Sequence, residues 1–169
     1  MENKVTTPVV KGLIISLCII VYSLILYFTD QYMNKSLGYV QYAIILGGVI
    51  WGCIIYANQM NNNVTFGNVF ADGFKTTAVF TVITVLYTAL AFKVLFPEMQ
   101  DKILEQTVAE MQKKNLSQDQ IDQAMTITNK FFFTFAIAGV LVFNVFLGTI
   151  ASLIGAAVAK KNPTDPFVQ

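Results

Sequence analysis

Four long apolar segments constrain this chain more than any other feature of its sequence. Residues 10–32, 39–57, 74–96 and 131–159 are each predominantly apolar, and polar stretches separate them. A helix needs about 20 such residues to cross the roughly 30 Å hydrocarbon core of a bilayer. Because lipid offers no hydrogen-bond partners, a spanning segment must pair its own backbone groups, as a helix does. The sequence therefore predicts an all-α integral membrane protein with four transmembrane helices, forming one membrane domain over residues 1–169.

The composition supports a membrane location and argues against several classes of partner. Hydrophobic residues make up 55% of the chain and charged residues 12%, whereas soluble domains have about 25% charged residues. The net charge is +1, so we expect no nucleic-acid partner. Histidine, which most often shuttles protons near neutral pH and ligates metals, is absent from the sequence.

No residue pattern predicts catalysis or cofactor binding. Cys18 and Cys53 lie inside apolar segments, and two thiols without histidine do not form a zinc site. Proteolysis within a membrane would need paired aspartates, a serine with a histidine, or a metal centre, and Asp72 has no second aspartate beside it. We therefore expect no enzymatic activity, and no catalytic, cofactor-binding or metal-binding residues.

The third apolar segment is preceded by an amphipathic stretch. A helix over residues 66–96 would measure about 46 Å, which exceeds the thickness of the membrane core. The first residues of this stretch divide into an apolar side and a polar side at helical spacing, namely Phe66, Val69, Phe70 and Phe74 against Asn68, Asp72, Lys75 and Thr76. We predict an interfacial helix at residues 65–76 that leads into the third span.

Residues 97–130 carry about half of the charged side chains and predict a polar helical hairpin between the third and fourth spans. Pro97 suits the beginning of a helix, because its missing N–H would have no partner there. Asn115 favours the left-handed conformation that ends a helix. Ser117 and Gln120 have the spacing of a capping box, which begins the next helix. These signals predict two amphipathic helices that are joined near residue 115.

The first helix of this hairpin carries an apolar stripe. Its members recur at helical spacing and are Met99, Ile103, Leu104, Val108 and Met111. Short isolated helices are marginal in water, so these side chains must pack against something. The facing stripe, Ile121 with Ala124 and Met125, is shorter. We expect the uncovered remainder to bind a membrane-protein partner or a second copy of the chain.

Small residues recur along the second and fourth spans. The second span holds Gly48 and Gly52, and the fourth span holds two rows, Gly148–Ser152–Ala156 and Ala151–Gly155–Ala159. Small side chains at this spacing allow helix backbones to approach closely. These faces are expected to pack against other helices, either within the same chain or in a partner.

Three polar residues placed against apolar sequence are candidate functional residues: Asp72, Lys75 and Asn144. Asp72 and Lys75 are three residues apart and could pair on one helical face, as a solvated pair near the membrane surface. Asn144 is expected to hydrogen-bond to a neighbouring helix. Four hydroxyls also share one face of the third span and either bond to nearby helices or line a solute pathway: Thr77, Thr81, Thr84 and Thr88.

The lysines indicate an orientation in the membrane. Lys4 and Lys11 flank the first span on its N-terminal side and only Lys35 follows it, which favours a cytoplasmic N-terminus. Lys160 and Lys161 after the fourth span agree with this orientation. The lysines of the hairpin oppose it. We expect cytoplasmic N- and C-termini.

The layout of the chain resembles a known family. The resemblance is carried by the four spans, by TFGNVFADGFKTT at residues 65–77 and by FPEMQDKILEQTVAEMQKKNLSQDQIDQAM at residues 96–125. The family is the uncharacterised bacterial membrane family catalogued as domain of unknown function 4199. The resemblance implies a location in the bacterial inner membrane and implies no activity and no residue roles.

These observations lead to one functional hypothesis and one alternative. The hypothesis is a non-enzymatic accessory or interaction subunit, surrounded by membrane lipids, that uses its hairpin and its small-residue helix faces to bind a membrane protein or its own copies. The alternative is a small transporter or channel that uses the threonine-lined face. A transporter should have a polar cavity along the threonines, whereas an interaction protein should have a filled bundle.

Overall fold

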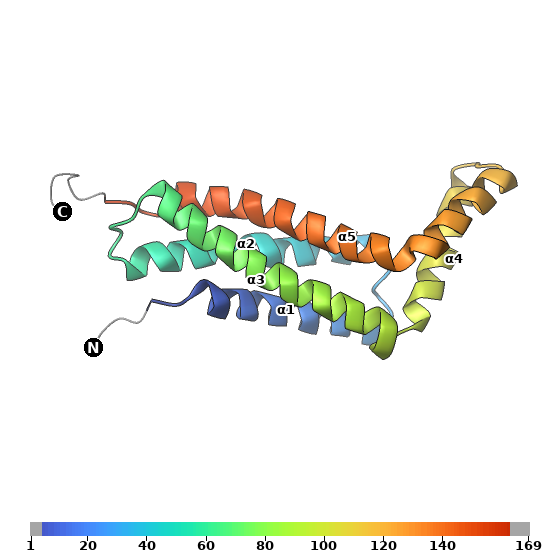
Figure 1. Cartoon of the computed structure of the whole chain (residues 1–169), viewed down its shortest axis with the longest axis horizontal. Coiled ribbons are helices and arrows are strands. Elements are labelled where there is room, and N and C mark those ends of the chain that lie inside the picture. The colour runs from blue at the N-terminus through green and yellow to red at the C-terminus, as the bar shows by residue number, and fades with distance from the viewer. Residues whose placement is uncertain (1–4, 163–169) are drawn as a thin grey trace. The chain divides into compact units, whose positions relative to one another are not determined.

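The computed structural model describes residues 5–162, and this range is helical without any strand. Its α-helices are α1 (Pro8–Phe28), α2 (Lys35–Gln59), α3 (Phe66–Leu90), α4 (Glu98–Lys113) and α5 (Gln118–Val158), and a π-helical turn, η1 (Ala91–Leu95), follows α3 (Figure 1). Lys4, one of the lysines that predict the membrane orientation, lies outside the described residues.

Four of the helical segments are long and apolar enough to cross a membrane. They are Pro8–Phe28, Lys35–Gln59, Phe66–Leu95 and Gln118–Val158. The predicted fold class, an all-helical membrane protein with four candidate spans, is therefore confirmed.

One helix is longer than the sequence pattern suggested. The second helix of the predicted hairpin and the fourth span at residues 131–159 are parts of α5. The physical reason is that the junction between them contains no proline and no capping motif, so nothing interrupts the backbone hydrogen bonds. The predicted continuous helix over residues 66–96 is present as α3 followed by η1.

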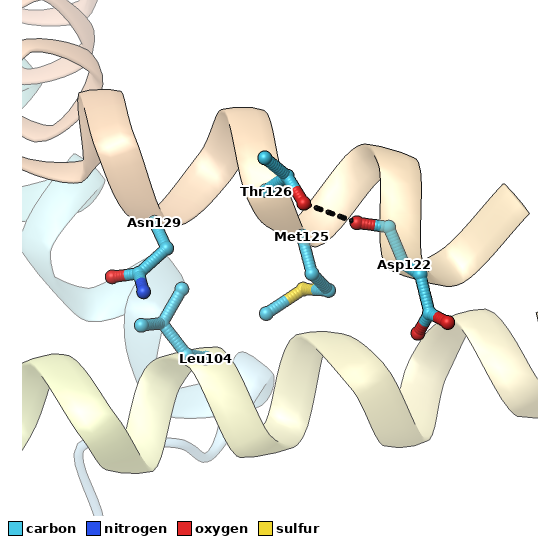
Figure 2. A pocket seen from close by; sticks show the side chains of 5 residues that line it. All are labelled: Leu104, Asp122, Met125, Thr126 and Asn129. Atoms are coloured by element: carbon cyan, nitrogen blue, oxygen red, sulfur yellow. Dashed lines mark hydrogen bonds between the residues drawn. The ribbon is translucent and has the colours of Figure 1, made fainter. Parts of the chain in front are cut away.

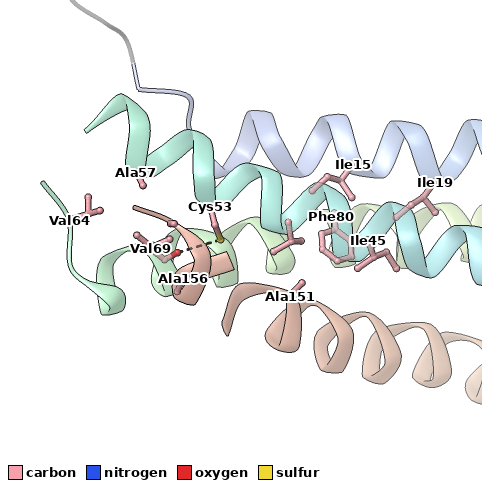
Figure 3. Packing of buried hydrophobic residues seen from close by; sticks show 12 residues of the cluster. Ile15, Ile19, Ile45, Cys53, Ala57, Val64, Val69, Phe80, Ala151 and Ala156 are labelled. Atoms are coloured by element: carbon pink, nitrogen blue, oxygen red, sulfur yellow. Dashed lines mark hydrogen bonds between the residues drawn. The ribbon is translucent and has the colours of Figure 1, made fainter. Parts of the chain in front are cut away.

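The chain divides into two compact units, and the division falls within α3 and α5. Unit 1 comprises Met1–Thr84 and Val142–Gln169, and unit 2 comprises Val85–Leu141. In unit 1, residues of α1, α2, α3 and α5 enclose an apolar core (Figure 3). Its buried members are Ile15, Ile19, Ile45, Val49, Cys53, Ala57, Val64, Val69, Phe80, Ala151, Ala156 and Ala159.

The small residues predicted to allow close helix packing are used inside unit 1. A Cβ atom added at Gly155 of α5 would lie 2.7 Å from the Cβ of Cys53 on α2. One added at Gly48 of α2 would lie 2.8 Å from Cγ1 of Ile15 on α1. Real Cβ atoms do not approach other atoms this closely, so both glycines are needed where they are. Of the two alternatives expected for these faces, the glycines therefore show packing within the same chain.

Several hydrogen bonds bring helix ends together at one end of unit 1. Thr7 caps α1 by accepting a 3.4 Å bond from the N–H of Val10. The N–H of Thr6 donates to Oε1 of Gln59, at the end of α2, over 2.8 Å. Beyond α5, the N–H of Asn162 donates to the carbonyl of Asn62 over 2.8 Å. The start of α1 and the end of α5 consequently lie at the same end of this unit.

In unit 2, the turn between α4 and α5 has the predicted details. Asn115 is left-handed, with φ 56°, and the N–H of Leu116 bonds back to the carbonyl of Met111 over 3.3 Å. The N–H of Ser117 donates to Oε1 of Gln120 over 3.0 Å, while the N–H of Gln120 donates to Oγ of Ser117 over 3.4 Å. These two reciprocal bonds form the capping box that begins α5.

Candidate functional site

A buried ion pair joins α1 to α3 within unit 1. Nζ of Lys11, in the first turn of α1, lies 2.6 Å from Oδ2 of Asp72, in the second turn of α3. Lys11 is 1% exposed and Asp72 is 6% exposed. Two oppositely charged side chains from helices far apart in the sequence therefore meet inside the bundle.

The neighbours of Lys11 satisfy its ammonium group. Besides the carboxylate, Nζ donates a 3.1 Å hydrogen bond to the carbonyl of Gly52 on α2, and it lies 5.3 Å from the centre of the Tyr56 ring. Gly52 also leaves space for the lysine, because a Cβ added there would lie 3.2 Å from Cδ of Lys11. The ion pair thus ties three helices together.

Pairing explains why two charges are tolerated at this position. A single charged side chain at the centre of a membrane span costs about 2.5–3.5 kcal/mol on insertion scales. Burial of a pair is acceptable only when the geometry is good and the remaining donors find partners. Lys11 and Asp72 meet both conditions, and together they carry no net charge.

The predicted partner of Asp72 is wrong. Instead of forming a solvated pair with Lys75, Asp72 is buried and paired with Lys11, whereas Lys75 is exposed. The physical reason is geometric. Asp72 lies on the core side of α3, next to the buried residues Val69 and Thr76, and only a facing helix can present a cation there. Lys75 lies at the edge of that side.

Sequence reasoning treated Lys11 only as a flanking charge for the membrane orientation. A signal was present, because Val9 and Val10 precede Lys11 and a long apolar run follows it. A lysine placed inside the apolar run needs a buried acidic partner or a route to the membrane surface. Asp72, which stands among apolar residues at the beginning of α3, is an acidic residue that could serve.

A cavity of about 360 Å³ opens beside the ion pair. Its lining includes the segment before α1, the end of α2 and the beginning of α3. The polar lining residues are Thr6, Thr7, Tyr56, Asn68, Asp72 and Lys75. Of the two charged partners, Asp72 therefore borders this cavity.

Asn144 and the threonines of α3 lie at the contact between α3 and α5 in unit 1. Nδ2 of Asn144 donates a 2.8 Å bond to Oγ1 of Thr84, so the expected bond to a neighbouring helix is formed. Oγ1 of Thr77 donates to the carbonyl of Gly73 on its own helix over 3.0 Å. A Cβ at Gly148 of α5 would collide with the Thr77 side chain. At these positions the threonine face is in contact with α5.

The apolar stripe of α4 is only partly covered within unit 2. Met99, Ile103, Leu104, Val108 and Met111 are all half-buried, and α4 contributes no fully buried residue. Figure 2 shows Leu104 of α4 directed toward Met125 and Asn129 of α5 across a small groove. On α5, Ile121 is 3% exposed. The first part of α5 therefore covers one side of the stripe.

The described residues give no basis for a metal centre. Within residues 5–162, no group of three or more cysteine, aspartate and glutamate side chains is placed to hold an ion. Two candidate sites remain: the ion pair with its cavity, and the apolar stripe on α4.

Comparison with known proteins gives a family match over most of the chain. The family model with the description "Protein of unknown function (DUF4199)" matches residues 11–161. The matched range includes both Lys11 and Asp72, and it includes α2, α3, α4 and α5 completely. No curated protein and no solved structure matches the chain.

Proposed function

The chain belongs to the DUF4199 family, whose function is unknown, and from this premise we propose a non-enzymatic accessory protein of the bacterial inner membrane. Its four long helices anchor it in the bilayer. Its role is to bind another protein, through the apolar stripe of α4. The proposed partner is a different membrane protein. The experiment below distinguishes this partner from a second copy of the chain.

The half-burial of all five stripe residues supports this proposal. An amphipathic helix in water normally buries its apolar face against the rest of its domain. On α4 the face formed by Met99, Ile103, Leu104, Val108 and Met111 keeps part of its surface exposed in unit 2. Aromatic and methionine side chains are enriched at the centres of protein interfaces, and two of the five residues are methionines.

The remaining residues of α4 keep this helix out of the hydrocarbon. Charged side chains occupy the exposed side, among them Asp101, Lys102, Glu105 and Lys113. The stripe is therefore offered to the aqueous phase near the membrane rather than to lipid tails. A protein surface with its own apolar patch is the occupant that such a helix fits.

We place the N- and C-termini in the cytoplasm and α4 on the opposite side of the inner membrane. The exposed lysines Lys75, in the first half of α3, and Lys160, just beyond α5, lie on the same side of unit 1 as the start of α1, in keeping with the excess of lysine on the cytoplasmic side. Residues 98–117 then face the periplasm. The partner would have to present its binding surface there.

Two matched double variants of α4 test the proposal. Val108→Glu with Met111→Glu places two carboxylates in the stripe, whereas Ala109→Glu with Gln112→Glu adds the same charge at two exposed positions. Photo-crosslinking in cells and co-purification in mild detergent report the partners of each variant. We expect the stripe variant to insert and fold but to lose its heteromeric products, while the control keeps them.

Two outcomes contradict the proposal. If the stripe variant keeps every crosslinked product of the parent, the stripe only covers α5. If the products lost are solely crosslinks between copies of this chain, the stripe is a self-association surface instead. The transporter alternative receives no comparable support, because Thr77 and Thr84 contact α5 rather than an open pathway.

A further inference from the structure

The cavity beside the Lys11–Asp72 pair has the properties of a binding site that the proposed function does not use. Its volume is about 360 Å³, which falls within the range of small-ligand pockets. Side chains from three separate parts of unit 1 converge on it, including Thr6, Tyr56 and Asn68. Of its lining residues, Asp72 is paired with Lys11 over 2.6 Å.

The charges around the cavity favour an anion. Lys11 neutralises Asp72, because the two form a 2.6 Å ion pair. Lys75 then remains as an exposed cation in the lining, and no ion pair involves it within residues 5–162. Lys161, at the end of α5, is held elsewhere by the carbonyl of Ala159, 3.0 Å from its Nζ. Counting Lys11, Asp72 and Lys75, the charges at the cavity sum to about +1.

The other polar groups in the lining can each donate hydrogen bonds. Oγ1 of Thr6 accepts a 2.8 Å bond from Nε2 of Gln59, which leaves its hydroxyl hydrogen to donate. Thr7, Tyr56 and Asn68 add two hydroxyls and one amide. A group with several oxygen acceptors and a negative charge, such as a phosphate, matches this set of donors with one lysine.

The position of the cavity points to phosphate carried by lipid. Its lining comes from residues just before α1, near the end of α2 and at the beginning of α3, which are ends of candidate membrane spans. Lipid headgroups lie at this depth. Exposed apolar side chains neighbour lining residues in the sequence: Val9, 54% exposed, follows Pro8, and Phe74, 42% exposed, precedes Lys75. These surfaces suit the acyl chains of a bound lipid.

We propose that this cavity binds the headgroup phosphate of an anionic membrane phospholipid, with Lys75 as the cation that meets the phosphate. Thr6, Thr7, Tyr56 and Asn68 supply donors to the remaining oxygens. Asp72, neutralised by Lys11, forms the inner wall of the site.

Thermal unfolding of the full chain in non-ionic detergent micelles tests this proposal. Three additives are titrated: phosphatidylglycerol, phosphate-free diacylglycerol and soluble glycerol phosphate. A ligand that binds only the folded protein raises its unfolding midpoint with concentration. We expect phosphatidylglycerol alone to do so. An equal rise with diacylglycerol would overturn the headgroup contact, and an equal rise with glycerol phosphate would overturn the lipid as the source.

Variants locate the binding. Lys75→Gln removes the proposed contact, and Lys160→Gln removes an exposed lysine at the end of α5, outside the cavity lining. One lysine near an anionic lipid is worth about a fivefold change in affinity. We expect Lys75→Gln to weaken the apparent affinity by this factor and Lys160→Gln to leave it unchanged. Ala71→Phe fills the cavity without a change of charge and should abolish the shift; equal shifts in all four proteins would refute the site.

Discussion

Nζ of Lys11 on α1 lies 2.6 Å from Oδ2 of Asp72 on α3, although 61 positions separate the two residues in the sequence. Each group is buried, and the lysine also bonds to the Gly52 carbonyl on α2. The pair therefore links the first three helices at one end of unit 1. Its effect on stability depends on both partners being present.

The first prediction concerns the removal of one partner. Lys11→Met leaves the Asp72 carboxylate buried without a cation, and loss of one member of a buried pair typically costs about 3–5 kcal/mol of unfolding free energy. The double variant Lys11→Met with Asp72→Leu removes both charges and should recover most of that loss. Denaturation by titration with SDS, followed by circular dichroism, measures the free energies.

A matched lysine serves as the control for this prediction. Lys75→Met also removes a positive charge, three residues after Asp72 in the sequence. Because Lys75 is exposed, this substitution should change the unfolding free energy by less than about 0.5 kcal/mol. Equal destabilisation by Lys11→Met and Lys75→Met would show that Lys11 is not the partner that matters. Additive effects in the double variant would show that the two side chains do not interact.

A second prediction concerns two glycines with opposite surroundings. A Cβ at Gly148 would collide with the Thr77 side chain, whereas a Cβ at Gly47 would meet no atom within 4 Å. Gly148→Ala should therefore destabilise the protein by about 1–3 kcal/mol through overpacking. Gly47→Ala should be neutral or stabilise it by up to about 1 kcal/mol, because alanine is the better helix former.

The sign of the difference between these glycine variants is the decisive quantity. Unfolding midpoints in the same detergent give it directly. If Gly148→Ala is as stable as Gly47→Ala, α3 and α5 do not pack as closely at Thr77 as described.

A third prediction concerns the orientation in the membrane. In a Cys18→Ala background, Gln112→Cys places an exposed thiol on α4, and Lys160→Cys places one just beyond α5. With cytoplasmic termini, an impermeant maleimide should label position 112 in intact spheroplasts and position 160 only after lysis. The reverse pattern would place both termini outside and would move α4, with its proposed partner, to the cytoplasm.

Much of the helical architecture could be predicted from local patterns. The four apolar segments specify spanning helices because a bilayer leaves the backbone no other way to satisfy its hydrogen bonds. The turn at Asn115 and the capping box of Ser117 with Gln120 were predictable because they involve residues within a few positions of one another. The continuity of α5 through residues 126–131 was not predictable in this way. The sequence changes from polar to apolar there, which suggests a boundary between two elements, although no residue in this stretch ends a helix.

The sequence by itself determined that the chain is a helical membrane protein, where its polar segment lies and how α4 ends. Only the tertiary structure decided which residues meet: that Asp72 pairs with Lys11 rather than Lys75, that Asn144 bonds to Thr84, and that Gly155 packs on Cys53. The reason is physical. Span formation and capping depend on residues near one another along the chain, whereas the rotation of each helix about its axis is set by how well all the helices of the bundle pack together.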